Sequence, residues 1–340
     1  MKKIFVINPG YDLQVSLEEW KQGKFPGHIL YGVNEFEKHG YEAIYPNDSV
    51  RYENGRHNRI KFEMNIIRQL MSRRREYELI YIPYLNLGIS ACLLKKIGVL
   101  NKPIVGLVHG IDFSKKKQYS MYFDALTRII IISEPLYQEF CKEFPGYVNK
   151  AQCVPLMPEI KEWDHKEECG YDFASIGKTN RDYSVLLDAI AKTDYKCVMV
   201  GTKELADANN EQLEVVDRFV DYGECLGYYR DSYVNVVTMK ECGGIFGLTS
   251  ILDSFTVGKP IIVTKTKYLS VPVEEWGIGI EVPEKDVDAL VRAMDKLRKD
   301  QVFYNTCREN LRRIAQTYNM DTFARRVCEN IDSALGLEKR

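Results

Sequence analysis

Short apolar runs and longer amphipathic segments alternate along the first half of the chain. The apolar runs lie at residues 4–7, 43–45, 79–82, 104–108, 129–132 and 151–154. They are typical of strands that are buried on both faces. Segments 28–39, 59–75, 89–97 and 135–144 are predicted as helices, and segments 8–27 and 47–58 as polar loops. This alternation predicts an α/β fold in which a parallel sheet is covered by helices on both faces.

The alternation breaks near the middle of the chain and then starts again. Pro155, Pro158 and the charged segment 159–168 are typical of a linker. Strands are predicted beyond it at 173–176, 197–200, 218–220, 234–238, 261–264 and 279–282, and helices at 183–191, 287–299, 304–318 and 322–335. Since 340 residues are long for one core, we predict two αβα domains, over 1–157 and 158–319.

Segment 243–264 has the pattern of a helix start that binds anions. Glycines lead into a short amphipathic helix, Gly258 is placed to end it, and Pro260 turns the chain into a strand. A helix that starts in this way presents N–H groups without partners, for which phosphate is a suitable ligand.

A second loop of this kind follows the first strand of the second half. Gly177 is followed by Lys178 and Arg181, two cations placed to bind a diphosphate, and Asp182 is placed to cap the next helix. In isolation both cations would read as solvated turn residues. Together with the helix start near Ser250, a diphosphate site is the better interpretation. Neither the G-x-G-x-x-G pattern nor the G-x-x-x-x-G-K-[ST] pattern occurs.

Composition excludes several classes of protein. A net charge of −1 argues against a general nucleic-acid binder. The nine cysteines show no C-x-x-C pair and no zinc-like spacing, so reduced thiols and no metal site are expected. The apolar run at the N-terminus is too short for a signal peptide, and no stretch is long enough to span a bilayer. We therefore expect a cytoplasmic protein.

Segment 51–75 is strongly basic. It contains eight basic residues against two acidic ones, an excess of six positive charges. Its helix places Ile60, Met64, Ile67, Leu70 and Met71 on one side, the predicted apolar side. A solvated helix face is the simpler interpretation of such a run. The alternative is docking to anionic lipid headgroups on the inner face of a membrane.

The run SIGKTNRDYSVLLDAI, followed by GLTSILDSFTVGKPIIVT, resembles the donor-binding half of retaining glycosyltransferases of the GT-B fold, family 4 type. The triplet Arg181-Asp182-Tyr183 is similar to that of one subgroup of this family. The resemblance covers 170–335 well and the first half loosely. It implies two Rossmann-like domains facing across a cleft, with the terminal helix, 320–338, crossing back to the N-terminal domain.

The resemblance also implies roles for individual residues. Lys178 and Arg181 match the basic pair that holds the donor diphosphate, and Asp253 matches the second acid of the E-x7-E motif, which contacts the ribose. The first acid of that motif falls at Gly244 or Ile245, and Glu241 is out of register. His109 resembles a strand-ending histidine near the reacting centre. Further donor-binding residues are expected at Gly177, Asn180, Gly247, Leu248, Thr249 and Ser250, and Gly10, Gly27 and His28 lie on loops expected to face the donor.

The implied function is metal-independent transfer of a hexose from a nucleotide-diphosphate donor to a glycan or lipid-linked hydroxyl, with retention, in bacterial-type polysaccharide or glycoconjugate synthesis. The nucleotide sugar is a substrate, and no cofactor or nucleic-acid partner is expected. Because the first acid of E-x7-E is missing, a catalytically silent sugar-nucleotide-binding subunit is the alternative. A GT-B sugar-nucleotide epimerase would need a pair of carboxylates that the sequence does not indicate.

Overall fold

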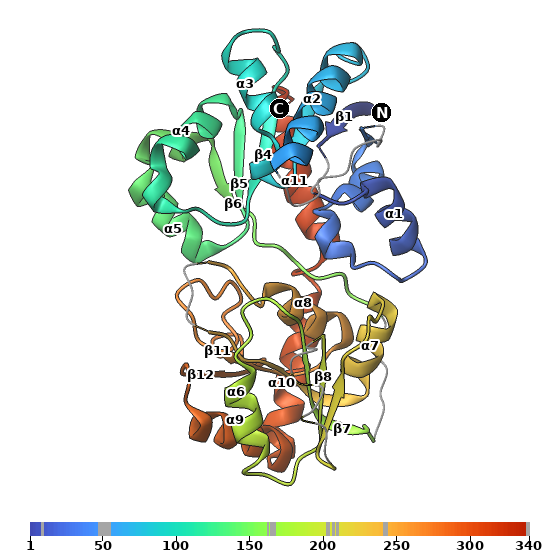
Figure 1. Ribbon diagram of the computed structural model, residues 1–340, viewed down its shortest axis with the longest axis vertical. Coiled ribbons are helices and arrows are strands. Elements are labelled where there is room, and N and C mark those ends of the chain that lie inside the picture. The colour runs from blue at the N-terminus through green and yellow to red at the C-terminus, as the bar shows by residue number, and fades with distance from the viewer. Residues whose placement is uncertain are drawn as a thin grey trace. The chain divides into compact units, whose positions relative to one another are not determined.

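The computed structural model describes residues 1–7, 10–46, 56–161, 163, 168–201, 205, 208, 211–240 and 244–337, without the side chains of 56–58 (Figure 1). The chain forms two compact units, which are considered separately. Unit 1 comprises Met1–Gln22, Leu30–Leu156 and Met320–Arg340, and unit 2 comprises Gly23–Ile29 and Met157–Asn319. The segment Gly23–Ile29 therefore clusters with the second unit, although its sequence position lies within the first predicted domain.

Unit 1 contains a six-stranded parallel sheet in the order β2-β1-β3-β4-β5-β6. Its strands are β1 (Lys2–Val6), β2 (Tyr41–Ile44), β3 (Leu79–Ile82), β4 (Ile104–Val108), β5 (Arg128–Ile131) and β6 (Ala151–Cys153). The helices between them are α1 (Leu13–Lys21), η2 (Val33–His39), α2 (Arg56–Ser72), η3 (Leu85–Leu87), α3 (Ile89–Lys96), η4 (Phe113–Lys115), α4 (Lys116–Ala125), α5 (Glu134–Glu143) and η5 (Pro145–Lys150). The last helix, α11 (Met320–Ala334), packs against η2, β4 and β5 of this unit.

Unit 2 contains a second six-stranded parallel sheet, in the order β12-β11-β10-β7-β8-β9. Its strands are β7 (Tyr171–Ile176), β8 (Cys197–Val200), β9 (Leu213–Val216), β10 (Ser232–Val237), β11 (Ile261–Thr264) and β12 (Gly279–Val282). Its helices are α6 (Tyr183–Ile190), α7 (Tyr222–Arg230), α8 (Leu248–Val257), α9 (Val287–Lys299) and α10 (Gln301–Ala315), and η1 (Gly27–Leu30) begins in it.

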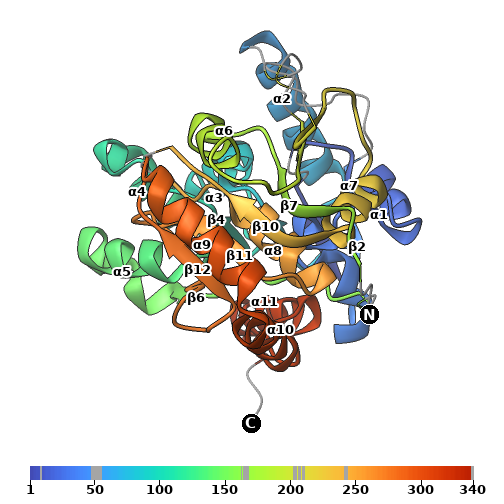
Figure 2. The ribbon, with the colours of Figure 1, turned by 90° about the horizontal axis from the view of Figure 1, so that it is seen from below.

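Alternate residues of the unit 2 strands face two separate cores. Phe173 and Met199 pack with α6, α9 and α10, whereas Ala174 and Val198 pack with α7 and the end of α8. Figure 2 shows α9 lying over β11 and β12. Both faces are covered, which explains why these strands read as continuous apolar runs.

The sheets and most helices agree with the sequence-based predictions, but five segments do not. Within the predicted loop 8–27, α1 begins at Leu13 and is capped by Asp12, whose side chain accepts from the Val15 N–H. Only Leu13 and Ser16 of α1 are buried, so it has no apolar stripe to detect. The predicted helix 28–39 is two 3-10 segments separated by Gly32, which has φ +85°. The predicted strand 218–220 is wrong, since β9 ends at Val216, and α4 and α7 were not predicted.

Helix α2 buries a different side from the predicted one. Its buried residues include Phe62, Ile66 and Leu70, each at most 2% exposed. Of the residues predicted to form its apolar side, Leu70 is buried, but three are exposed: Ile60 by 54%, Met64 by 66% and Ile67 by 36%. The exposed and the buried apolar residues lie on different faces of one helix, and the apolar pattern alone did not indicate which face is buried. None of the described helices is long and apolar enough to cross a bilayer.

Each sheet has one point where the direction of winding reverses. In unit 1 it lies between β1 and β3, and in unit 2 between β7 and β10. The loops that follow such a pair of strands diverge to opposite faces of the sheet, leaving a crevice at the carboxyl ends where ligands bind. The predicted donor loops follow β7 and β10, at the reversal in unit 2.

Candidate functional site

The loop after β7 is built around a close approach of Gly177 and Arg181. Gly177 has φ +142°, and a Cβ atom there would lie 2.5 Å from the Arg181 Nη2. Asn180 also has a positive φ, +57°, and its side-chain amide donates to the Lys240 carbonyl. These contacts fold the loop back so that Arg181 pairs with Met239, just beyond β10. The loops after β7 and β10 are thereby joined.

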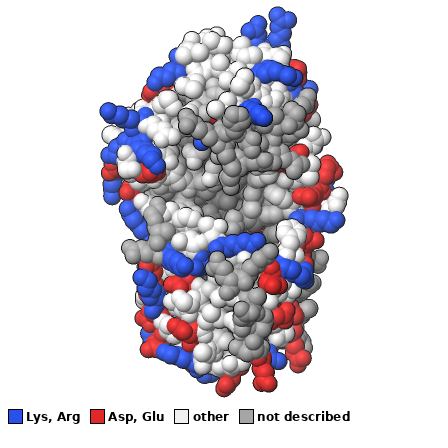
Figure 3. All heavy atoms as spheres, in the orientation of Figure 1, with Lys and Arg blue, Asp and Glu red and all other residues white. Residues whose placement is uncertain are grey.

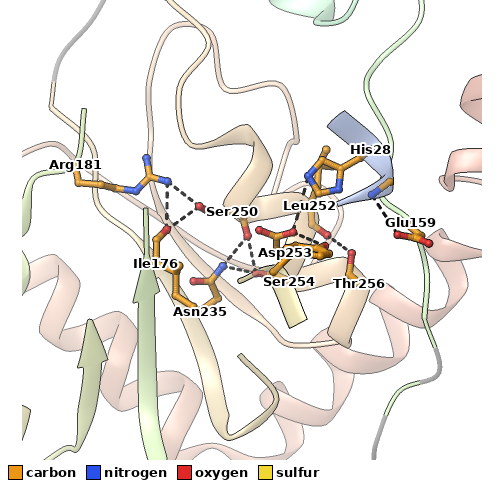
Figure 4. A network of polar contacts seen from close by, with 12 residues as sticks. His28, Glu159, Ile176, Arg181, Asn235, Ser250, Leu252, Asp253, Ser254 and Thr256 are labelled. Carbon is orange, nitrogen blue, oxygen red and sulfur yellow. Dashed lines mark hydrogen bonds and ion pairs between the residues drawn. The ribbon is translucent and has the colours of Figure 1, made fainter. Parts of the chain in front are cut away.

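Arg181 lies inside this junction and is 7% exposed (Figure 4). Its Nη2 donates to the Ser250 Oγ at 2.7 Å and to the Ile176 carbonyl at 3.5 Å, and its Nη1 donates to the Thr179 carbonyl at 3.1 Å. All of these acceptors are neutral, and no carboxylate among the described residues forms an ion pair with Arg181. A buried cation without a counter-charge is costly, and an anion bound nearby offsets that cost.

Helix α8 supplies a second group of donors. Gly247 precedes it with φ +74°, and no side chain caps its first turn, so N–H groups at Leu248, Thr249 and Ser250 lack intrahelical partners. The Ser250 hydroxyl is turned inward and donates to the Ile176 carbonyl at 2.8 Å. Below it, the Asn235 amide of β10 donates to the Ser250 carbonyl and to the Ser254 hydroxyl. This buried network fixes the start of α8 against β7 and β10 (Figure 4).

Lys178 is exposed at the mouth of the same loops, with its side chain against Gly201. No ion pair involves it among the residues that the structure describes. Asp182 occupies the N-cap position of α6, but its carboxylate accepts from the Ser184 hydroxyl instead of a helix N–H, so the predicted cap hydrogen bond is absent. The loops after β7 and β10 thus carry two cations without an ion-pair partner among the described residues and a helix start without a described side-chain cap, an arrangement that suits a diphosphate.

Asp253 lies on α8, next to two side chains from other elements. It accepts from the Tyr222 hydroxyl at 2.9 Å, and its Oδ1 lies 3.9 Å from the His28 Nε2 (Figure 4). Burial raises the pKa of Asp253 to about 7, opposed by the Tyr222 hydrogen bond and by Lys161. Burial, with help from Lys161, lowers the pKa of His28 to about 3. The Asp253 side chain keeps 14% exposure, so it remains accessible to a polar ligand.

The E-x7-E motif has no acid at its first position. Gly244 and Ile245 occupy that place, and neither side chain can accept a hydrogen bond from a sugar hydroxyl. Glu241 lies outside the described residues. Sugar recognition at this position would therefore depend on backbone groups or on other residues.

His109 belongs to unit 1 and follows β4. Its Nε2 lies 2.7 Å from the Pro83 carbonyl, which only accepts, so the Nε2 carries the proton and the Nδ1 is left as an acceptor. The rings of Tyr31 and Tyr84 pack on it at centroid distances of 4.7 and 4.8 Å. Burial lowers the pKa of His109 to about 4, with the Pro83 hydrogen bond opposing the shift. The ring is neutral at pH 7.

We expect the His109 ring to titrate with a midpoint near pH 4 in NMR spectra of labelled histidine, because its tyrosine-lined surroundings disfavour the imidazolium. His109→Gln identifies the signal by its loss. A midpoint near the ordinary histidine value of about 6.5 would contradict this assignment of charge.

We expect Gly177→Ala to destabilise unit 2 by about 2 kcal/mol or more, because the new Cβ meets the Arg181 guanidinium and the backbone has a positive φ. Thermal unfolding measures the effect. Gly227→Ala is the matched control, since it lies within α7 with no atom within 4 Å of the added Cβ. Alanine suits a helix better than glycine, so this control should not be destabilised.

Two residues of the site, Asn235 and Tyr222, were not predicted from the sequence, and a third, His28, was assigned only to a loop. Asn235 interrupts the apolar run of β10, and a polar residue in such a run is a signal that could have been used. Tyr222 begins α7 and carries no signal of this kind. His28 was placed on a loop facing the donor, and its contact with Asp253 depends on the clustering of Gly23–Ile29 with unit 2.

Comparison with known proteins gives one family match. Residues 166–314 match the family model described as "Glycosyl transferases group 1", and this range includes the loops after β7 and β10. No curated protein sequence matches the chain.

Solved structures match almost the whole chain at low sequence identity. Sucrose-phosphate synthase from Thermosynechococcus elongatus is 14% identical, with a TM-score of 0.73 over 99% of this chain and 100% of that one. HepE from Anabaena in complex with UDP-glucose is 12% identical, with a TM-score of 0.70 over 98% and 100%. Trehalose 6-phosphate synthase from Burkholderia multivorans is 12% identical, with a TM-score of 0.70 over 99% and 100%. These similarities confirm the predicted fold class, GT-B with two Rossmann-like units.

Proposed function

We propose that this protein is a glycosyltransferase that moves a hexose from a nucleotide-diphosphate donor to a hydroxyl of a glycan or lipid-linked acceptor, with retention of configuration. We further propose that it acts in bacterial-type polysaccharide or glycoconjugate synthesis. We also propose that it belongs to the subgroup of family 4-type glycosyltransferases that has the triplet Arg181-Asp182-Tyr183. The family match over 166–314 and the UDP-glucose held by the HepE structure support the nucleotide-sugar donor.

The observation that carries the proposal is the junction of two anion-binding loops at the winding reversal of unit 2. Arg181, in the loop after β7, donates to Ser250, in the first turn of the helix α8 that follows the loop after β10. A diphosphate bound there would pair with the Lys178 ammonium and the Arg181 guanidinium and accept hydrogen bonds from the N–H groups of Leu248–Ser250. Arg181 and the N–H groups at the start of α8 are held in place before the nucleotide sugar binds, so they would stabilise charge on the departing diphosphate without reorganisation.

In this mechanism the bond between the sugar and the diphosphate oxygen breaks while the acceptor oxygen attacks the same face of the sugar. The acceptor proton passes to the departing phosphate oxygen. Asp253 binds the ribose, and neutral His109 offers its Nδ1 as an acceptor near the reacting sugar. Because fixed cations serve the leaving group, we propose that no metal is required. A donor complex with a carboxylate at the acceptor hydroxyl would overturn this proton route.

A thermal-shift screen with nucleotide sugars tests the donor assignment, since a ligand that binds only the folded state raises its melting temperature. The best donor is then used to assay transfer, and NMR of the product anomer tests retention. If no nucleotide sugar raises the melting temperature, the proposed function is wrong.

The absent first acid of E-x7-E favours a second candidate, a catalytically silent sugar-nucleotide-binding subunit of a partner transferase. This subunit would bind the donor in the thermal-shift screen but show neither transfer nor slow donor hydrolysis. An enzyme would show at least one of these activities, and Lys178→Ala would abolish it.

We also propose that α2 docks to an anionic membrane surface, at the cytoplasmic face. The exposed side chains of Ile60, Met64 and Ile67 recur at helical spacing and form an apolar stripe on the outer face of α2. Exposed Lys61 and Arg68 accompany it, and exposed Arg74 and Arg75 follow the helix. Arg51 and the side chain of Arg56 lie outside the described part of the chain. An apolar stripe beside cations matches the chemistry of an anionic bilayer surface.

We expect Ile60→Ser/Met64→Ser to reduce flotation with anionic liposomes about tenfold or more, because both apolar side chains lose burial in the bilayer. Ile97→Ser is the matched control, an apolar residue of unit 1 that is 69% exposed and lies outside α2. Flotation that is equal for the two variants would remove the membrane proposal.

A further inference from the structure

Unit 1 contains a cavity that the proposed donor chemistry does not use. Its volume is about 590 Å³, and it is lined by residues of unit 1 alone. Gly10 follows β1, Tyr84 and Asn86 follow β3, and Lys115 and Tyr119 come from the segment after β4. The cavity therefore lies at the winding reversal between β1 and β3, where open parallel sheets bind ligands.

The lining combines cations, amides and phenols. Arg59 and Lys115 are its charged members, and no carboxylate is among the described lining residues. Asn86, Gln118 and three tyrosines (Tyr84, Tyr119 and Tyr122) supply hydrogen-bonding groups and aromatic faces. Amides and aromatic rings suit a sugar, whereas two cations without a lining acid suit an anionic group.

Both cations are available to a ligand. Arg59 is held in place by a hydrogen bond from its Nη2 to the Asn86 carbonyl at 3.0 Å, and its side chain is 40% exposed. The nearest carboxylate on its helix, Glu63, lies 4.0 Å from its Nε, and that carboxylate accepts from Ser90. Lys115 pairs with Asp112 at 2.7 Å, with both side chains well exposed. Such an exposed pair is weak and exchanges easily for a ligand anion.

The cavity also adjoins the neutral histidine. Tyr84 lines the cavity, and its ring packs on the His109 ring at 4.8 Å. Figure 3 shows further basic side chains gathered over α4, on the left of the view, in keeping with the lysines at the start of that helix.

We propose that this cavity binds the acceptor, and that the acceptor is a sugar bearing an anionic oxygen group, held by Arg59 and Lys115. The role of this sugar as the acceptor rests on the proposed function. The binding of an anionic sugar in unit 1 does not, because it can be measured without any transfer. Phosphate and carboxylate groups share the required chemistry, and the test below separates them.

The test compares four probes by saturation-transfer NMR titration on the full chain: glucose, glucose 6-phosphate, glucuronate and geranyl phosphate. We expect at least one anionic probe to bind about tenfold or more tightly than glucose, the gain of one charge-assisted hydrogen bond. Preference for glucose 6-phosphate or for glucuronate identifies phosphate or carboxylate as the anionic group of the sugar. Preference for geranyl phosphate over both anionic sugars would identify a lipid phosphate site and overturn the inference.

Variants assign that binding to the cavity. Arg59→Gln and Lys115→Gln should each weaken the preferred anionic probe about tenfold and leave glucose unchanged, and Arg59→Lys should retain part of the affinity. Lys117→Gln is the matched control, an exposed lysine two residues from Lys115 that does not line the cavity.

Lys178→Ala removes a predicted donor cation from unit 2 and should leave probe binding intact. Binding lost in Lys178→Ala but kept in Arg59→Gln would place the anion in unit 2 and overturn the inference. Equal affinity for all four probes would also overturn it. If no nucleotide sugar binds but an anionic sugar still binds to the cavity, the proposed function is wrong and the binding site in unit 1 remains.

Discussion

Lys178→Ala is expected to lower kcat/KM for sugar transfer about a hundredfold or more. The Lys178 ammonium is exposed in the loop after β7 and has no ion-pair partner among the described residues, so its charge is available to the departing diphosphate. Removal of one such preorganised donor commonly costs about 100- to 1,000-fold in turnover. Steady-state kinetics with the donor found by thermal shift measures the loss.

The control for this experiment is Lys192→Ala, another exposed lysine of unit 2. Lys192 pairs with Asp288 at 2.7 Å on the surface, and such pairs contribute little. Its kinetics should match those of the native protein. A Lys178→Ala enzyme within about threefold of the native kcat/KM would show that the diphosphate is stabilised elsewhere, because a threefold change is far below the effect of an oxyanion donor.

Asp253→Asn is expected to be more stable than the native protein at pH 8, and this difference should shrink as the pH falls toward 4. The pKa of Asp253 in the folded chain is about 7, above the ordinary 3.8, so the folded state holds its proton more tightly than the unfolded state does. Stability from this group is fully present below pH 4 and is lost as the pH rises through 7, by an amount on the order of 4 kcal/mol. Asparagine keeps an acceptor for Tyr222 and has no charge to bury.

Urea unfolding at pH 5, 6, 7 and 8 measures this effect. Asp288→Asn is the control of opposite sign, because hydrogen bonding and attraction from Lys192 lower the pKa of that exposed carboxylate. If Asp253→Asn lost stability at pH 8, Asp253 would be ionised at little cost in the folded state. If donor affinity falls while stability rises, Asp253 is kept for ligand binding at the expense of stability.

Sequence patterns were most informative where burial is uniform. Strands β3, β4 and β8 are buried at every position, and they were predicted with their observed bounds. Glycines that end helices with a positive φ were also predicted from the sequence. Gly258, at the end of α8, is an example, with φ +69°. The Trp163 ring packs so closely on Gly258 that no Cβ would fit there, a contact from the linker that no local pattern indicates.

The sequence by itself determined the class of fold, the order of the strands along the chain and the two loops with anion-binding chemistry, because these depend on local periodicity and residue type. Only the tertiary structure decided which groups are exposed. It placed Arg181 inside the junction and Lys178 outside it, turned Ile60 and Met64 of α2 outward, and brought His28 to Asp253. Exposure and pKa depend on atoms that are distant in sequence, and a local pattern carries no information about them.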